Sequence, residues 1–441
     1  MMIANEKEVI MELNGCLQPA GDKSMTHRAI ILSSLAEGTT YIYDPLLGED
    51  CLATLEIFKQ LGVYYVTRNN ILIIKSPGMK AFTQQPLILN AHNSGTTARL
   101  LMGVLAALPL KIALEGDSSL SRRPMKRVKD PLSLMGAQIE LNQDQTLPAT
   151  ITGKVLRGIT YQIPMASAQV KSALMLAGML AKGKTMIQEP MATRDHTEKM
   201  FELFQISYNK NNNELTIPGQ QLPITPGKIH IPADISSAAY LMVAALLVPG
   251  SDVTLKNVGI NPTRTGILEV IKAMKGRIDL ENQTYLGMEP VADIRIKYTE
   301  NLIATDISGA IIPRLIDEIP IIALLATKAQ GTTIIKDAAE LKVKESNRIE
   351  TTVSVINQLG AKAQATADGM TIDGSPEQKL RGSKFSSFED HRLALMLGVA
   401  SLLTDCPLEI DGLNCLNISY PNFSRHLQQL KRGANHDRNL Y

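Results

Sequence analysis

A lysine, a serine and an arginine stand at the start of an apolar stretch in GDKSMTHRAIILSSLAEGTT, residues 21–40. Asp22 or Ser24 fits the position that caps a helix, because a short side-chain oxygen there accepts a backbone N–H that the helix leaves unbonded. Arg28 follows Ser24 by four residues, so both side chains lie on one side of the helix. This helix start, with Lys23 and Arg28 beside it, is therefore predicted to bind an anion. A capped surface helix with solvated charges is the alternative for a single stretch of this kind.

The same arrangement recurs at five further points, each where a strongly apolar stretch begins. Because polar or charged residues open every one of these stretches, coincidence becomes the weaker explanation. If the helix starts face one cleft, their N-termini and charged groups converge on an anionic ligand. The residues at the further starts are Asn93, Ser94, Gly95, Thr96 and Arg99; Ser167, Gln169 and Lys171; Asp234 and Ser236; Asp317 and Glu318; and Glu389, Asp390, His391 and Arg392.

Three more segments contribute cations. They are SLSRRPM with Arg122 and Arg123, TRDH with Arg194, Asp195 and His196, and LKVKESNRIE with Lys344, Glu345 and Arg348. Arginine binds carboxylate or phosphate through two parallel hydrogen bonds, whereas lysine acts as a point charge. The presence of several arginines and several lysines favours a pair of substrates that carry both carboxylate and phosphate groups. For any single arginine, a solvated surface pair is the ordinary alternative.

Four carboxylates stand among these cations, namely Asp317, Glu318, Glu345 and Asp390. A carboxylate that faces a cation stays ionised and acts as a base, whereas a partly desolvated one carries a proton to a substrate carbon. The set therefore predicts proton transfer. Glu318 also fits a helix-cap neighbour with no chemical role.

These side chains must be positioned by a supersecondary unit that repeats about every 70–80 residues, which fits duplication of a βαβ-type unit. Each copy pairs a very apolar helix with an amphipathic one, and a helix that is apolar on all sides must be buried. The predicted fold is α/β, with two similar domains of three units each, helices inside and strands outside. Pro and Gly at 19–21 and 227–234 mark the expected hinges, giving one domain of 20–229 and a second of 1–19 plus 230–441.

Composition narrows the class of protein. The 441 residues carry a formal net charge of +2 and only 4% are aromatic, so nothing indicates a nucleic-acid partner. The four cysteines form no CxxC, which favours reduced thiols in a cytoplasm. The longest apolar run, 238–248, is too short to cross a bilayer, so we expect a soluble protein. The charged tail from Lys431 is expected to fray.

Several catalytic motifs are absent from the sequence. It has no GxxxxGK[ST], no GxGxxG after a strand, no HExxH or other metal-ligand spacing among its histidines, and no GxSxG. A P-loop kinase, a dinucleotide enzyme and a serine hydrolase are therefore not indicated. We predict no cofactor and no metal.

Long motifs over nearly the whole chain resemble those of 5-enolpyruvylshikimate-3-phosphate synthases, the enolpyruvyl transferases of the shikimate pathway. They occur in order as GDKSMTHRA, NSGTTARLL, SLSRRPM, SAQVKSALMLAG, RDHTEK, NPTRTG, IDEIPIIA, LKVKESNRI and EDHRLAL. The sequences of SAQVKSA, TRDHTEK and NPTRTG most resemble those of the bacterial branch that includes glyphosate-tolerant members. The resemblance implies an inside-out α/β barrel fold in two domains that close over a cleft.

The resemblance further implies transfer of the enolpyruvyl group of phosphoenolpyruvate to the 5-hydroxyl of shikimate 3-phosphate, with release of phosphate. This step belongs to chorismate and aromatic amino acid biosynthesis. The expected partners are these two small molecules, with no cofactor, no nucleic acid and no membrane. We expect a cytoplasmic monomer.

Carried over by motif, each matched residue has an expected role. Shikimate 3-phosphate is expected at Lys23, Ser24, Arg28, Ser167, Gln169, Arg194, Asp317 and Lys344. Phosphoenolpyruvate is expected at Lys23, Gly95, Arg123, Gln169, Arg348 and Arg392. Asp317 would be the base for the 5-hydroxyl and Glu345 the proton donor to the enol methylene, with Lys23 and His391 assisting. Which carboxylate delivers the proton stays open, because a coupled pair shares such a task.

Two positions depart from relatives. Many relatives have a lysine just before the C-terminal [ST]-[FY]-P, whereas Ile418 stands there, so one phosphoenolpyruvate contact is missing or replaced. Tolerant members have Ala where this chain has Gly95. Because an added methyl shortens the space for a longer inhibitor, we expect glyphosate to compete with phosphoenolpyruvate and Gly95→Ala to weaken it. Differences in the residues that surround the substrate contacts, Ile418 included, are another route to glyphosate tolerance.

Two other functions remain as alternatives. UDP-N-acetylglucosamine enolpyruvyl transferase shares the fold and the donor, but it uses a loop cysteine and a lysine-asparagine pair, where this chain has SLSRRPM and Lys23-Ser24. A non-catalytic anion-binding protein on the same repeat would bind shikimate 3-phosphate without releasing phosphate, and Asp317 and Glu345 would be replaceable.

Overall fold

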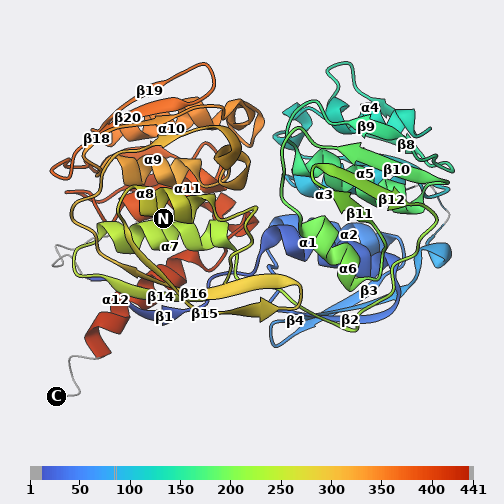
Figure 1. The fold of residues 1–441 in the computed structure, drawn as a ribbon, viewed down its shortest axis with the longest axis horizontal. Coiled ribbons are helices and arrows are strands. Elements are labelled where there is room, and N and C mark those ends of the chain that lie inside the picture. The colour runs from blue at the N-terminus through green and yellow to red at the C-terminus, as the bar shows by residue number, and fades with distance from the viewer. Residues whose placement is uncertain (1–11, 84, 86, 437–441) are drawn as a thin grey trace. The chain divides into compact units, whose positions relative to one another are not determined.

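The computed structural model describes residues 12–83, 85 and 87–436. Tertiary contacts divide this part of the chain into two compact units, whose ribbons are drawn in Figure 1. The first unit comprises Gly21–Ile231 and Leu286–Met288, and the second unit comprises the rest.

One sheet pattern repeats through both units. Five four-stranded sheets share the same order, in which the first strand is parallel to its neighbour and that neighbour is antiparallel to the next. In the first unit the sheets are β13 (Lys228–His230), β2 (Glu37–Tyr43), β4 (Ile71–Pro77) and β3 (Tyr64–Arg68); β5 (Leu87–Asn90), β6 (Lys111–Glu115), β8 (Ala149–Thr152) and β7 (Gln138–Leu141); and β9 (Thr160–Gln162), β10 (Lys184–Gln188), β12 (Glu214–Pro218) and β11 (Asn209–Asn211).

The second unit repeats this order twice and ends in a shorter pair. Its sheets are β1 (Asn14–Leu17), β14 (Asp252–Gly259), β16 (Glu289–Lys297) and β15 (Arg277–Leu286); β17 (Asp306–Ile307), β18 (Gly331–Ile335), β20 (Met370–Gly374) and β19 (Lys362–Ala365); and the parallel pair β21 (Lys384–Ser386) and β22 (Glu409–Asp411). Because a parallel pair needs a long crossover, a helix separates the first two strands of most repeats. The repeated βαβ-type unit predicted from the sequence is confirmed.

The first sheet of each unit takes its edge strand from far along the chain. Strand β13 pairs with β2, placing Ile229 opposite Ile42, and β1 pairs with β14, placing Cys16 opposite Thr254. The chain leaves the second unit between Ala20 and Gly21, a few residues after β1. These long-range pairs complete each unit from two separate chain segments.

Six inner helices begin the repeats. They are α1 (Lys23–Leu35), α3 (Gly95–Leu105), α5 (Ala168–Leu180), α7 (Ile235–Leu247), α9 (Ile319–Ala326) and α11 (His391–Ala400). Every residue of α7, α9 and α11 is buried. In Figure 1, α7, α9 and α11 lie between the β14–β16 sheet and the β18–β20 sheet of the second unit. The prediction that apolar helices occupy the interior is therefore confirmed.

The amphipathic helices each bury one face. They are α2 (Glu49–Gln60), α4 (Lys126–Leu134), α6 (His196–Leu203), α8 (Gly266–Ala273), α10 (Arg348–Gln358) and α12 (Phe423–His436). Helix α12 corrects one expectation, because the chain from Lys431 to His436 is helical rather than frayed. Residues 437–441 of that tail lie outside the described residues. No helix in the described ranges has the length and apolarity needed to span a membrane.

Candidate active site

The inner helices begin at short polar side chains. Five of the six are capped by a side-chain oxygen that accepts a hydrogen bond from a backbone N–H of the first turn. The capping residues are Asp22 for α1, Ser94 for α3, Ser167 for α5, Asp234 for α7 and Asp390 for α11. Of the two candidates for the first cap, Asp22 holds it and leaves the Ser24 hydroxyl for other contacts. The remaining N–H groups and the helix dipole favour an anion at each start.

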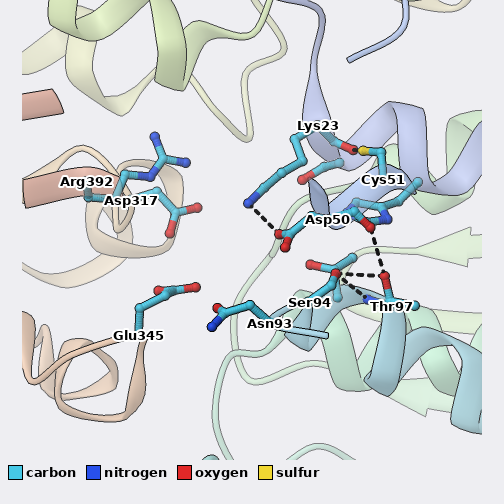
Figure 2. Close-up of polar contacts among 12 residues, drawn as sticks. Lys23, Asp50, Cys51, Asn93, Ser94, Thr97, Asp317, Glu345 and Arg392 are labelled. Carbon is cyan, nitrogen blue, oxygen red and sulfur yellow. Dashed lines mark hydrogen bonds and ion pairs between the residues drawn. The ribbon is translucent and has the colours of Figure 1, made fainter. Parts of the chain in front are cut away.

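The start of α1 brings together four predicted shikimate 3-phosphate ligands of the first unit. Arg194 Nη1 donates to Ser24 Oγ at 2.5 Å, and Arg28 Nη1 donates to the Ser24 backbone oxygen at 2.9 Å. Lys23 Nζ lies 2.9 Å from Asp50 Oδ2 (Figure 2). The start of α1 thus carries three cations, of which Arg194 bonds to the Ser24 hydroxyl, Arg28 to the Ser24 backbone oxygen and Lys23 to Asp50.

Arg28 is buried and is held by hydroxyl groups. Its Nε donates to Thr197 Oγ1 at 2.7 Å, and its Nη2 donates to Ser172 Oγ at 2.6 Å. These two hydroxyls also bond to each other at 2.7 Å. Neutral oxygens fix the guanidinium in place without themselves cancelling its charge. Sequence reasoning missed Thr197 and Ser172, which come from α6 and α5.

The start of α3 holds the phosphoenolpyruvate ligands predicted in the first unit. Arg123 Nη2 donates to Asn93 Oδ1 at 2.6 Å and to Ser119 Oγ at 3.2 Å. Arg123 is only 6% exposed, whereas its neighbour Arg122 is exposed. The structure thus separates the two adjacent arginines, and it places Arg123, the one that the resemblance singled out, beside the helix start.

Gln169 links α5 to α3. Its Oε1 accepts from Arg99 Nη1 at 2.8 Å, and its Nε2 donates to Thr96 Oγ1 at 3.3 Å. Gly95 lies beside the same guanidinium, because a Cβ there would stand 2.9 Å from Arg99 Nη1 and 3.4 Å from Arg123 Nη1. The missing side chain of Gly95 therefore leaves the space that these two cations border.

Asp50 is a contact that the motif comparison missed. It belongs to the first turn of α2, and its side chain pairs with Lys23 while its backbone oxygen accepts from Thr97 Oγ1 at 3.2 Å (Figure 2). Thr97 Oγ1 also bonds to Ser94 Oγ at 2.7 Å. The starts of α1 and α3 are thus connected through α2. An acidic residue in the first turn of an amphipathic helix was the only sequence signal for it.

The second unit gathers carboxylates around Arg348. This buried guanidinium lies 2.8 Å from Asp390 Oδ2, 2.5 Å from Glu345 Oε2 and 3.5 Å from Asp317 Oδ1. Burial opposes its charge, but the carboxylates outweigh burial and raise the pKa of Arg348 above its ordinary value. Arg348 therefore stays charged and holds three acids within reach of one another.

Asp317 also faces Lys344, whose Nζ lies 3.5 Å from its Oδ1. The side chains of Asp317 and Glu345 are 18% and 17% exposed, so both are accessible to a ligand. Figure 2 shows these two acids with Arg392, which begins α11 with His391. Burial works against the charge of Arg392, but Tyr240, Asp317 and Glu318 raise its pKa overall.

Glu318 has a different environment from its neighbour Asp317. It is 1% exposed, its Oε1 accepts from the Ser236 hydroxyl, and Arg264 Nη2 lies 3.8 Å away. Burial, and then the charge of Asp317, raise the pKa of Glu318. A buried acid bonded to its own unit is poorly placed to meet a substrate, which supports Asp317 as the accessible acid.

Comparison with known proteins identifies the family of this chain. A family model described as EPSP synthase (3-phosphoshikimate 1-carboxyvinyltransferase) matches residues 7–427. This chain belongs to the EPSP synthase family. A 3-phosphoshikimate 1-carboxyvinyltransferase of Bacillus subtilis is 45% identical over 97% of this chain and 99% of its own length. One of Staphylococcus aureus is 48% identical over 95% and 96%.

Solved EPSP synthase structures share the fold. The enzyme of Acinetobacter baumannii matches with a TM-score of 0.84 and 40% identity, over 95% of this chain and 96% of its own. A second structure from that organism gives 0.83 and 39%. The predicted α/β fold class, including its EPSP synthase architecture, is confirmed.

Ile418, which the resemblance marks as a departure at an expected phosphoenolpyruvate contact, lies in the second unit. It is 6% exposed and packs in a small apolar cluster with Ala394 and Cys415. Its side chain fills the interior beside α11 and offers no charge. Within the described residues, no group of three or more His, Cys, Asp and Glu side chains is arranged to hold a metal ion.

Proposed function

We propose that this chain transfers the enolpyruvyl group of phosphoenolpyruvate to the 5-hydroxyl of shikimate 3-phosphate and releases phosphate. Membership of the EPSP synthase family, whose curated relatives are named 3-phosphoshikimate 1-carboxyvinyltransferases, supports this reaction. The observation that carries it is the cluster of Asp317, Lys344, Glu345 and Arg348, in which two accessible acids are held by cations. The step would serve chorismate and aromatic amino acid biosynthesis in the cytoplasm.

Shikimate 3-phosphate is assigned to the start of α1. Lys23, Ser24, Arg28 and Arg194 would hold its phosphate, because two guanidinium groups bond to Ser24 there and the helix start offers backbone N–H groups. The other proposed ligands are Ser167 and Gln169 in the first unit and Asp317 and Lys344 in the second.

Phosphoenolpyruvate is assigned to the guanidinium groups near Gly95 and to those of the second unit. Its phosphate and carboxylate each match an arginine fork. The proposed ligands are Lys23, Gly95, Arg123, Gln169, Arg348 and Arg392. Both substrates are polyanions, so the cations must first offset their mutual repulsion.

The chemistry follows from the two acids. Asp317 acts as the base and takes the proton of the 5-hydroxyl while the hydroxyl oxygen bonds to C2 of phosphoenolpyruvate. Glu345 gives a proton to C3 in the same step. The product is a tetrahedral ketal phosphate. Loss of a C3 proton then re-forms the double bond and expels phosphate. Lys344 and Arg348 near Asp317 favour its ionised form, and Lys23 and His391 assist with charge.

The finer assignments are part of the same proposal. The segments 19–21 and 227–234, rich in Pro and Gly, are the proposed hinges between domains of 20–229 and 1–19 plus 230–441. We place the chain near the bacterial branch with glyphosate-tolerant members and expect it to act as a monomer. Gly95 nevertheless supports competition between glyphosate and phosphoenolpyruvate, because glycine places no methyl group beside the guanidinium groups of Arg99 and Arg123.

A coupled phosphate-release assay with both substrates tests the reaction. We expect phosphate release only when shikimate 3-phosphate and phosphoenolpyruvate are both present, and none when UDP-N-acetylglucosamine replaces the shikimate substrate. Release with the sugar nucleotide would instead support the other enolpyruvyl transferase. Binding of shikimate 3-phosphate without release would support the non-catalytic alternative.

A further inference from the structure

A buried lysine at the start of α5 has no part in the proposed reaction. The side chain of Lys171 is 0% exposed. Its Nζ donates to Glu198 Oε1 at 2.8 Å, to Glu189 Oε2 at 3.2 Å and to the Thr193 backbone oxygen at 3.3 Å. An ammonium group has three protons, and these three acceptors match them.

The three acceptors lie on the connection of residues 189–195 and on helix α6, which follows it. Glu189 directly follows β10, Thr193 precedes Arg194, and Glu198 lies in the first turn of α6. Thr193 Oγ1 also donates to Glu189 Oε1, which joins the two ends of the connection to each other. A single ammonium group therefore fixes the beginning, the end and the following helix of the segment that carries Arg194.

Arg194 itself is partly exposed and reaches α1. Its Nη1 donates to Ser24 Oγ at 2.5 Å, at the proposed shikimate 3-phosphate site. The Thr193 carbonyl held by Lys171 belongs to the peptide bond that leads into Arg194. Displacement of this peptide would move the guanidinium directly, because only the Arg194 side chain separates the two.

The charges of the cluster hold the ammonium firmly. Glu189 and Glu198 are 1% and 2% exposed, and Lys210 Nζ approaches Glu198 Oε1 at 3.6 Å. Two cations thus face two carboxylates. Removal of one charge from a buried set leaves its partner uncompensated, so the surrounding segment must move to reach water.

We propose that Lys171 is a positioning residue that fixes Arg194 for the phosphate of shikimate 3-phosphate. This inference rests on the proposed role of Arg194. Lys171 touches no substrate and acts through the 189–195 connection. Its loss should weaken binding of shikimate 3-phosphate and leave phosphoenolpyruvate, none of whose proposed ligands lies on the 189–195 connection, nearly unaffected.

A double-mutant cycle tests this coupling. The dissociation constant of shikimate 3-phosphate is measured by isothermal titration calorimetry for the wild type, Lys171→Met, Arg194→Ala and the double variant. We expect Lys171→Met to raise this constant about tenfold in the wild type but less than about twofold when Arg194 is already absent. The KM for phosphoenolpyruvate should change less than about twofold. Equal losses in both backgrounds, or a fall in melting temperature with unchanged affinity, would overturn the proposal.

Thr193→Val provides a milder variant in case Lys171→Met does not fold. It removes the hydroxyl bond to Glu189 and keeps every charge, so a rise of about threefold in the same constant is expected, again only when Arg194 is present. Thr185→Val is the matched control, because Thr185 is a fully buried threonine of β10 whose hydroxyl has no hydrogen-bond partner among the described residues. It should leave the constant unchanged, and an equal rise in this control would count against the proposal.

The single variant Arg194→Ala separates the two proposals. A wild-type chain that does not bind shikimate 3-phosphate contradicts the proposed function. Unchanged affinity in Arg194→Ala contradicts the role of Arg194 and, with it, this inference. Weakened affinity in Arg194→Ala with full affinity in Lys171→Met contradicts the role of Lys171 alone.

Discussion

The two units hold their buried arginines in different ways. In the first unit, hydroxyl oxygens of Thr197 and Ser172 accept from Arg28. In the second unit, carboxylates of Asp390, Glu345 and Asp317 surround Arg348. Neutral acceptors fix a cation while its field still attracts anions, whereas carboxylates form a charged set that can exchange protons. We therefore propose that the first unit mainly binds the substrates and that the second unit mainly transfers protons.

Exposure distinguishes the reactive carboxylates from the structural ones. The first unit also has a cation held by two acids, because Lys171 pairs with Glu189 and Glu198. Those acids are 1% and 2% exposed, while Asp317 and Glu345 of the second unit are 18% and 17% exposed. A substrate can meet only the latter pair.

The largest expected effect concerns the accessible acid. Asp317→Asn should lower kcat by about 10²–10⁴-fold, because it removes the proposed base while keeping its shape. The measurement is steady-state phosphate release with both substrates saturating. Arg194→Ala in the first unit is the comparison and should mainly raise the KM for shikimate 3-phosphate. A kcat for Asp317→Asn within fivefold of the wild type, or a kcat loss as large in Arg194→Ala, would remove the contrast.

Stability should respond to the same difference. Arg348→Met leaves the buried carboxylate of Asp390 without its cation and should cost about 3–5 kcal/mol of unfolding free energy. Arg28→Met leaves hydroxyls that can bond to each other and should cost about 1–3 kcal/mol. Urea denaturation followed by circular dichroism measures both. Equal costs, or a larger one for Arg28→Met, would show that the acceptors do not differ in energy as their charges imply.

A methyl group at Gly95 probes the anion-binding side. A Cβ there would stand 2.9 Å from Arg99 Nη1, so Gly95→Ala must displace that guanidinium by a small amount and narrow the space beside Arg123. We expect the inhibition constant of glyphosate to rise about tenfold or more, and the KM for phosphoenolpyruvate to rise less. Competition kinetics on the two proteins measure this. Equal inhibition of both would contradict the assignment of this space to phosphoenolpyruvate.

The smallest effect tests the buried acid of the second unit. Burial first, and Asp317 second, raise the pKa of Glu318, so the folded state favours its protonated form. This contribution to stability is complete below the unfolded-state pKa of about 4.3 and is lost as the pH rises through the folded-state value. The wild type should therefore lose stability relative to Glu318→Gln as the pH rises above about 4.3. A constant difference in unfolding free energy across this range would show that Glu318 is as easily ionised as an exposed acid.

Local patterns predicted much of this molecule because their causes are local. A capping side chain and the N–H group that it accepts lie within three residues, so Ser94 and Ser167 could be placed at helix starts directly and the first cap could be narrowed to Asp22 or Ser24. The apolar character of the inner helices predicted their burial. The same logic failed at Lys431, where charged residues suggested fraying although the helix continues to His436.

The motifs predicted the candidate site less completely than the local patterns predicted the fold. They named Lys23 and Arg28, but not Asp50, which pairs with Lys23, or Thr197, which accepts from Arg28. These partners are short polar residues in ordinary amphipathic helices, and no local pattern separates them from solvent-exposed ones. Lys171 was noted at its helix start, yet nothing in the sequence indicated that its ammonium group would be fully buried.

By itself, the sequence determined the repeated α/β units, the buried helices with polar starts and the family, because periodicity, capping and motif order act over a few residues at a time. Only the tertiary structure decided that Arg123 rather than Arg122 is buried, that β13 completes the sheet of β2, and that Lys171 holds the Arg194 segment. The physical reason is distance along the chain. Which groups meet across many residues depends on packing and desolvation of the whole unit, and those energies are set only when it folds.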